Sequence, residues 1–262
     1  MTDTLNVDLR GRLAIVRMNR PERRNALSID AMRELTRCAT DLALEPALDV
    51  VILTGTSTWF SAGADLKDKA RWEALSKSLV EARDIAGVGY RMARAWEEMP
   101  QITIAAIEGY AIGGGIALAL ACDWRIAADD SFVSLPEIGL GIPLTWGTLA
   151  RLVALSGPAT AKRLTILCER IDAAEAKAMG IVDYVVPKGG ALEKALAVAA
   201  QVLEKPRAVV RMSKETINAT AFTLAHLASH AAADQFTLAA TSEESRAARA
   251  RFTRNPGDRA DS

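Results

Sequence analysis

The sequence lacks the features by which a chain binds nucleic acid or builds a disulfide framework. Its 262 residues carry 32 basic and 32 acidic side chains, so the formal net charge is zero, and aromatic residues make up only 5%. With no excess of positive charge and few rings for stacking, we expect no nucleic-acid partner. The three cysteines, Cys38, Cys122 and Cys168, form no CxxC pair. This pattern is typical of a reducing compartment, and it predicts no bound metal.

Long hydrophobic runs are missing as well. Residues 1–10 contain no apolar segment of the kind that a secretory signal needs. The most apolar stretch, residues 109–122, is too short and too rich in glycine to cross a bilayer. We therefore expect a cytoplasmic protein without membrane association. A content of 50% hydrophobic and 24% charged residues is typical of a globular chain, and the length suffices for one large domain.

Apolar patterns predict an α/β fold with a helical C-terminal region. A hairpin is predicted over residues 5–18, strands at 50–53, 102–107, 124–127, 132–134 and 181–186, and helices at 29–42, 116–121, 145–155, 159–167, 192–203, 208–218 and 222–245. The helical segment 71–99 contains Gly87 and Gly89, where we expect a kink or a break. No linker divides the chain. We expect one structural unit, with an α/β core over 1–190 and a helical region over 191–262 that takes part in oligomerisation.

Three glycines, Gly113, Gly114 and Gly115, follow a predicted buried strand and open a predicted helix. N–H groups at a helix start have no partner within the helix, and glycine lets a ligand approach them closely. Neither of the usual phosphate-binding glycine motifs is present. The triplet can therefore form an oxyanion hole, or it can serve only the close packing of strand on helix.

Two further segments complete a candidate site. The loop 62–65 also follows a buried strand, and it can place a second N–H beside the first if the two strands are neighbours in one parallel sheet. Two such donors are what a thioester enolate requires. Glu137 is embedded in the apolar segment 135–143. Desolvation there would raise its pKa and make it a usable proton shuttle. Asp65 taken alone is typical of a turn or a helix cap.

Other catalytic arrangements find little support. A serine triad would have to recruit His226 or His230, the only histidines, and no G-x-S-x-G motif is present. His226, His230 and Asp234 recur along one helix face but cannot easily converge on one metal ion. We expect these side chains to face a helix partner or water.

In this order and spacing, the segments resemble the crotonase (enoyl-CoA hydratase/isomerase) superfamily over nearly the whole chain. The resemblance is carried by Arg20-Pro21, Asn25-Ala26-Leu27, Phe60 to Leu66, Gly109 to Gly115, Cys122-Asp123, Pro136-Glu137, Ala174-Glu175-Ala176, Gly180-Ile181-Val182 and Ser213-Lys214-Glu215. It implies a crotonase-like spiral of ββα units with a helical C-terminal region, assembled as a homotrimer or a hexamer. It also implies an acyl-CoA thioester substrate, with coenzyme A as part of the substrate and no separate cofactor.

The resemblance also assigns roles to residues. The N–H groups of Ala64 and Gly114 match the family's oxyanion hole, with Gly113 beside them. The loop that holds Ala62, Ala64, Asp65 and Leu66 would bind the adenine and pantetheine side of coenzyme A. A basic residue among Arg20, Arg23 and Arg24 would meet the CoA phosphates. We take Arg24 as the expected residue, although the sequence does not separate the three.

The sequence departs from the hydratase pattern at one decisive position. Hydratases carry a second glutamate two residues after the glycine triplet, where this chain has Ala117, while Glu137 matches the glutamate that is kept. A single carboxylate suffices to move a proton between two carbons of an enolate, so the pattern favours isomerase-type or lyase chemistry. A hydratase with an unidentified second acid and a non-catalytic acyl-CoA-binding protein stay open as alternatives. Dienoyl-CoA isomerases have a second acid where this chain has Thr145, and Clp-type peptidases need a serine that residues 116–119 lack.

Overall fold

The computed structural model describes residues 4–229 and 231–254. Its main sheet has six strands in the order β1-β2-β3-β4-β6-β9. They are β1 (Leu5–Arg10), β2 (Leu13–Met18), β3 (Val50–Thr54), β4 (Ile102–Ile107), β6 (Trp124–Ala128) and β9 (Tyr184–Val186). β1 and β2 form an antiparallel hairpin, and the remaining neighbours pair in parallel. The carboxyl ends of the parallel strands therefore meet at one edge, the place where such sheets bind ligands.

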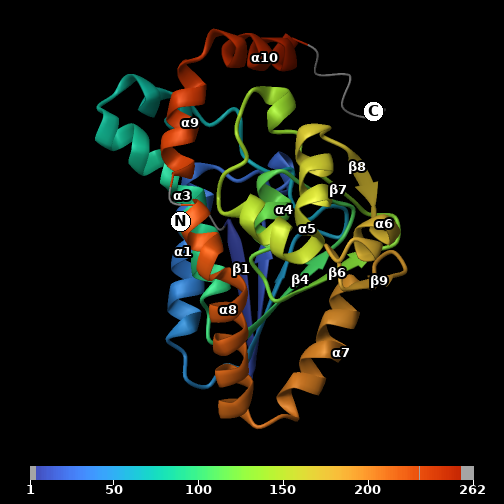
Figure 1. Ribbon diagram of the computed structural model, residues 1–262. Helices are drawn as coiled ribbons and strands as arrows, with labels where there is room; N and C mark the ends of the chain where they lie inside the picture. The colour runs from blue at the N-terminus through green and yellow to red at the C-terminus, as the bar shows by residue number, and fades with distance from the viewer. Residues whose placement is uncertain (1–3, 230, 255–262) are drawn as a thin grey trace.

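Helices cover both faces of this sheet (Figure 1). On β3, Val51 and Leu53 face one core cluster, while Val50 and Ile52 face another. The first cluster includes side chains of α1 (Ile29–Ala43) and α3 (Leu79–Glu97), and the second includes those of α7 (Ala191–Leu203). Burial on both faces explains why β3 and β4 consist almost entirely of apolar residues.

A second, smaller sheet joins β5 (Tyr110–Ile112), β7 (Phe132–Ser134) and β8 (Arg170–Asp172). β5 follows β4 directly and leads into α4 (Gly114–Ala119), and β7 follows β6 in the same way. The chain therefore repeats a strand–strand–helix unit. All three of these strands have only three residues, too few to display a period of two clearly, and the apolar pattern predicted β7 but missed β5 and β8.

The helical segment over residues 71–99 is interrupted, but not at its glycines. It comprises α2 (Lys69–Glu73), the 3-10 turn η2 (Ala74–Ser76) and α3, and the break lies just before Ser78, whose side chain caps α3. The predicted kink at Gly87 and Gly89 is wrong, since α3 runs unbroken through both. At Gly89 the missing side chain makes room for a tryptophan ring, so this glycine serves packing rather than bending.

The remaining helices wrap around this core. They are α5 (Thr148–Ile166), α6 (Ala173–Ala178), α8 (Arg207–Ser229), α9 (Ala232–Thr241) and α10 (Glu243–Arg254). Gly157 is non-helical and divides α5 where the sequence predicted two helices. The predicted division between residues 218 and 222 is absent, because α8 continues through it. α8 packs on α5, α9 on α3, and α10 on the turn η3 (Ile138–Leu140). None of the described helices is long and apolar enough to cross a membrane.

Candidate active site

Two loops meet at the carboxyl edge of the main sheet. The loop after β3 is pinned to β5 by a bridge between Ser61 and Ala111, in which Ile112 N donates to Ser61 O at 3.0 Å. Gly63 takes a positive φ of 84°, and a β-carbon on it would fall 2.4 Å from Ile112 O. Only glycine permits this approach. The approach brings the loop 62–65 against the start of α4, as the parallel-sheet argument predicted.

The N–H groups of Ala64 and Gly114 lie side by side at this junction. Leu27 donates to Gly63 O at 2.7 Å and accepts from Asp65 N at 3.0 Å, so the N–H of Ala64 points away from that pairing. Gly114 opens α4, where the first N–H groups have no partner within the helix. A β-carbon on Gly114 would fall 3.2 Å from Ala64 N. Neither N–H donates a hydrogen bond within the described part of the chain. Two convergent donors of this kind can stabilise an oxyanion.

Glu137 brings its carboxylate to the same place. It follows β7 and immediately precedes η3. A β-carbon on Gly113 would fall 2.4 Å from Glu137 Oε1 and 3.2 Å from its Cδ. Gly113 itself takes a positive φ of 51°. The acid group therefore contacts the residue directly before the donor Gly114.

Burial raises the pKa of the Glu137 carboxyl to about 7. The residue as a whole is partly exposed, but its Oε2 is closed to solvent and has no hydrogen-bond partner among the described residues. Removing the carboxylate from water disfavours its charged form, which is the effect expected from the apolar neighbours in the sequence. A carboxyl group that titrates near neutrality can both accept and return a proton.

Ala117 stands one helical turn after Gly113 and is buried. Its N–H donates to Gly113 O at 3.0 Å, so it stands one turn of α4 beyond the residue that Glu137 contacts. A carboxylate at position 117 would be a second acid near this contact, whereas the methyl group of Ala117 offers no proton.

The acids of the segment 71–99 do not replace it. Glu73 is exposed to solvent. Glu81 accepts hydrogen bonds from Ser78, and the carboxylate of Asp84 pairs with an arginine of its own helix at 2.9 Å. None of these contacts places an acid of this segment beside Glu137, so the second acid of the hydratase alternative stays unidentified.

Trp146 forms a wall of the site that sequence reasoning missed. Its buried ring lies between two glycines: a β-carbon on Gly89 would fall 2.0 Å from Trp146 Cε2, and one on Gly114 would fall 2.3 Å from Trp146 Cζ3. The ring therefore covers the donor residue Gly114 directly. Trp146 also holds a positive φ of 63°, a conformation that bulky residues rarely adopt. In the sequence, Trp146 is marked only as the single aromatic residue in the apolar segment that follows Glu137.

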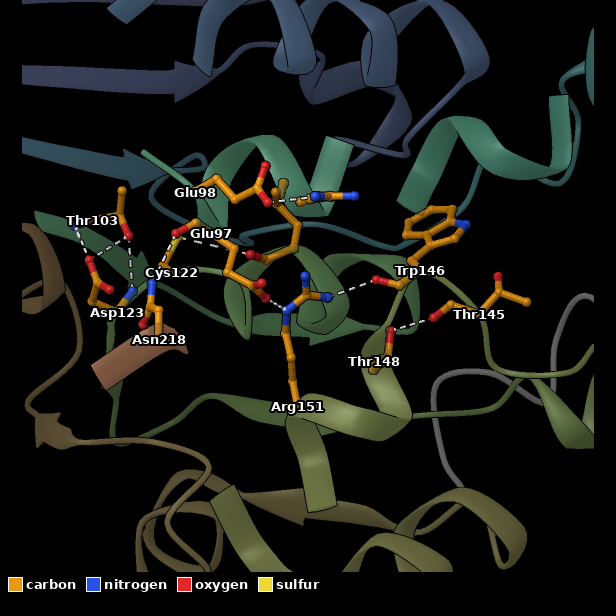
Figure 2. Close-up of polar contacts among 12 residues, drawn as sticks. Glu97, Glu98, Thr103, Cys122, Asp123, Thr145, Trp146, Thr148, Arg151 and Asn218 are labelled. Carbon is orange, nitrogen blue, oxygen red and sulfur yellow. Dashed lines mark hydrogen bonds and ion pairs between the residues drawn. The ribbon is translucent and has the colours of Figure 1, made fainter. Parts of the chain in front are cut away.

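A buried ion pair fixes the backbone of Trp146 (Figure 2). Arg151 on α5 pairs with Glu97 on α3, and its Nη1 donates to Trp146 O at 2.8 Å. Both charged side chains are buried. Thr148 Oγ1 donates to Thr145 O at 2.7 Å in the same turn. Glu97 lies 54 residues before Arg151, so no local pattern in the sequence could reveal this pair.

The residues predicted to bind coenzyme A surround the loop 62–65. Ala62 N donates to Arg24 O at 3.0 Å, and this bond brings Arg24 beside the loop with its side chain exposed. Asp65 lies 3.6 Å from a nitrogen of Arg20 and caps the turn that follows it. Leu66 O accepts a hydrogen bond from Trp72 at 2.9 Å. Arg20 is thus engaged in the fold, while Arg24 is exposed; their roles toward CoA stay predictions.

The structure gives no support for a histidine, metal or cysteine site among the described residues. His230 lies outside the described residues, and the side chain of His226 is not described either. Among the described residues no group of three histidine, cysteine or acidic side chains could hold a metal. Burial raises the thiol pKa of Cys38 and of Cys122 to about 12, so both stay protonated and unreactive at neutral pH.

Solved structures define the class of fold. An enoyl-CoA hydratase from Mycobacterium avium subsp. paratuberculosis superposes with a TM-score of 0.85 and 26% identity over 96% of both chains. An enoyl-CoA hydratase/isomerase from Xanthobacter autotrophicus gives a TM-score of 0.86 and 28% identity, covering 96% of this chain and 93% of that one. The protein therefore has the crotonase fold, with a mixed α/β core and a helical C-terminal region.

Sequence comparison identifies the family. The profile of the enoyl-CoA hydratase/isomerase family matches residues 9–255. The crotonyl-CoA hydratase of Syntrophomonas wolfei is 37% identical over 208 residues, which cover 79% of this chain and 78% of that protein. The short-chain-enoyl-CoA hydratase of Clostridium acetobutylicum is 34% identical over 209 residues, with the same coverage. This chain belongs to the enoyl-CoA hydratase/isomerase family and is an acyl-CoA enzyme.

Proposed function

We propose that the protein moves a proton between two carbons of an acyl-CoA enolate, with Glu137 as the single acid–base group. The observation that carries the proposal is the contact of the Glu137 carboxylate with Gly113, directly beside the N–H groups of Ala64 and Gly114. One group can take and return a proton while the other two hold the negative oxygen. Ala117 supports single-base chemistry, because it leaves position 117 of α4 without a carboxylate.

The steps of an isomerisation follow from these positions. The Glu137 carboxylate takes a proton from the α-carbon of a 3-enoyl thioester, and the electron pair of that C–H bond passes into the thioester carbonyl. The N–H groups of Ala64 and Gly114 bind the resulting oxyanion. Glu137 then returns the proton to the γ-carbon, the double bond moves into conjugation, and the carboxylate is regenerated. The steps consume no cofactor, since coenzyme A enters and leaves as part of the thioester.

Hydration of a 2-enoyl-CoA is the alternative, and the names of the two relatives at 37% and 34% identity favour it. It would require a second group to orient water. Ultraviolet absorbance separates the two reactions, because isomerisation of a 3-enoyl-CoA creates a conjugated thioester and hydration destroys one. We expect the first signal to dominate and Ala117→Glu to raise hydration relative to isomerisation. Hydration at ordinary enzyme rates, near ~10 s⁻¹, would refute the single-base proposal.

The role of Glu137 can be tested independently of the reaction type. A saturated acyl-CoA incubated in deuterated water exchanges its α-protons if the enzyme forms the enolate, and nuclear magnetic resonance records the exchange. Glu137→Gln keeps the shape but not the base, so exchange should fall by at least about a hundredfold while the thioester still binds. Binding without exchange in the natural protein would instead support a non-catalytic acyl-CoA-binding protein.

A further inference from the structure

Arg71 on α2 is a buried arginine without a carboxylate partner. The residue is only 7% exposed, and its Nε and Nη2 are closed to solvent with no hydrogen-bond partner among the described residues. Burial lowers the pKa of its guanidinium, although an arginine stays charged at neutral pH. A buried charge without a partner costs stability, so its presence calls for a reason other than folding.

The nearby acids are occupied elsewhere. Asp68 and Asp65 are the carboxylates whose charge acts on Arg71. Asp68 accepts hydrogen bonds from Ile29 N at 2.7 Å and from Ala70 N at 3.1 Å. Asp65 accepts from the turn that follows it and lies near Arg20. Neither acid is hydrogen-bonded to the guanidinium of Arg71.

The two unpartnered nitrogens form one edge of the guanidinium. Nε–H and Nη2–H point in the same direction, and this edge can hold both oxygens of a carboxylate. The same chain shows this geometry on its surface: Arg83 donates from Nε to Asp234 Oδ1 at 2.7 Å and from Nη2 to Oδ2 at 3.5 Å. Arg71 thus has a carboxylate-binding edge that no carboxylate of the described chain is hydrogen-bonded to.

Arg71 is also placed beside the candidate active site. Its guanidinium carbon lies 6.0 Å from the centroid of the Trp146 ring, within reach of a cation–π contact. The far edge of that ring contacts Gly114. The indole of Trp146 is therefore a neighbour of both the guanidinium and the donor residue Gly114. Arg71 is thus close enough to the candidate site for a group on a bound acyl chain to be considered as its partner.

We propose that the Nε and Nη2 of Arg71 bind a carboxylate carried by the acyl group, so that the protein prefers CoA thioesters of dicarboxylic acids. The inference rests on the proposed function, because it assumes that the thioester occupies the donors of Ala64 and Gly114. The inference adds to that function a preference for a carboxylate at the end of the acyl chain away from the thioester. A charge-assisted, two-bond contact in a site closed to water favours such an acyl group over a neutral one.

Matched thioesters test the inference through binding alone. Pentanoyl-CoA and glutaryl-CoA have the same five-carbon chain, and they differ by a methyl group and a carboxylate at its end. Calorimetric titration should give at least about tenfold tighter binding for glutaryl-CoA, or for the succinyl or adipoyl member of a parallel series against its own neutral match. Arg71→Met should abolish this preference and leave the affinity for the neutral thioester unchanged. Arg71→Lys should retain part of it, because lysine keeps the charge but loses the two-bond edge.

Controls separate the other outcomes. Arg91→Met removes an exposed arginine that pairs within its own helix, so it should change neither affinity. Arg71→Met should also raise the melting temperature of the ligand-free protein, since it removes an unpaired buried charge. If Arg71→Met weakened the binding of both thioesters equally, Arg71 would contact the coenzyme A part that they share, and the inference would be overturned. A natural protein that binds both thioesters equally would overturn it as well, while the proposed function would stand. Failure to bind either thioester would overturn the proposed function itself.

Discussion

The carboxylate of Glu137 lies against the α-carbon of Gly113, so closely that a β-carbon there would fall 2.4 Å from Oε1. Gly113 is also the N-cap residue of α4, and the next residue, Gly114, supplies one of the two oxyanion donors. Gly113 thus contacts the carboxylate of Glu137 and directly precedes the donor residue Gly114.

Gly113→Ala should therefore damage catalysis more than folding. The new methyl group would meet the carboxylate and would also strain a backbone with a φ of +51°. Gly11→Ala is a matched control, because Gly11 has a φ of +61° and no atom within 4 Å of an added β-carbon. We expect both variants to lower the melting temperature, and Gly113→Ala alone to abolish α-proton exchange. Equal activity of the two variants would contradict the contact.

The reaction rate should rise with pH through about 7. Glu137 acts as a base only when it has lost its proton, and burial raises the pKa of this carboxyl to about 7. A pH profile of kcat/KM for proton transfer reports this ionisation in the free enzyme. A rate that is flat from about pH 5 upward would mean that the carboxyl titrates at its ordinary value and that the burial argument is wrong.

The same pKa has the opposite effect on stability. A carboxyl whose pKa is raised in the folded state contributes stability that is fully present below its ordinary value of 4.5 and is lost as the pH rises through about 7. Glu137→Gln removes this dependence. Its melting temperature relative to the natural protein should therefore increase between about pH 5 and pH 8. A difference that stays constant over this range would show that the ionised group is not desolvated in the fold.

The ion pair of Glu97 and Arg151 should be important for stability and for the position of Trp146. Glu97→Gln leaves Arg151 charged and buried, and breaking a buried pair costs about 3–5 kcal/mol. Asp234→Asn breaks the exposed pair with Arg83 and should cost far less. Chemical denaturation measures both. We also expect Glu97→Gln to raise KM for acyl-CoA, because Arg151, no longer paired, would hold Trp146 O less firmly. An unchanged KM would show that the ion pair does not affect substrate binding.

Assembly stays a prediction. The family resemblance implies a homotrimer or a hexamer, and we expect the apolar residues of the C-terminal helices to supply part of its buried surface: Phe222, Leu224, Leu227, Phe236 and Leu238. The structure divides this set, because Phe236 is buried within its own chain, Leu238 is exposed, and the side chains of Leu224 and Leu227 are not described. Exposed apolar residues on α8, such as Met212 and Ile217, offer a further surface for a second copy.

Local chemistry made the core of the site predictable. Loops after buried strands, a glycine triplet at a helix start and a glutamate among apolar residues each carry a signal in the sequence itself. The structure brings the loop 62–65, the glycine triplet and Glu137 together as those signals indicated, whereas the choice of Ala64 and Gly114 as the donors came from the family resemblance. The sequence did not point to Arg71, Trp146 or Arg151, because their roles depend on contacts between α2, α3, α4 and α5. No periodic pattern encodes such contacts. The prediction of a kink in α3 was wrong for the same reason. Gly89 makes room for the ring of Trp146, which is far along the chain.

The packing of Trp146 on Gly89 makes residues 89 and 146 a size-matched pair. Neither position can change alone, since an added β-carbon at Gly89 would occupy the place of the indole and a smaller residue at 146 would leave a void. Divergence within the family at these two positions should therefore be correlated, with larger residues at one accompanying smaller residues at the other. Exchanging bulk between them would shift the indole that lies against Gly114, which offers a route to altering the accepted acyl group by design.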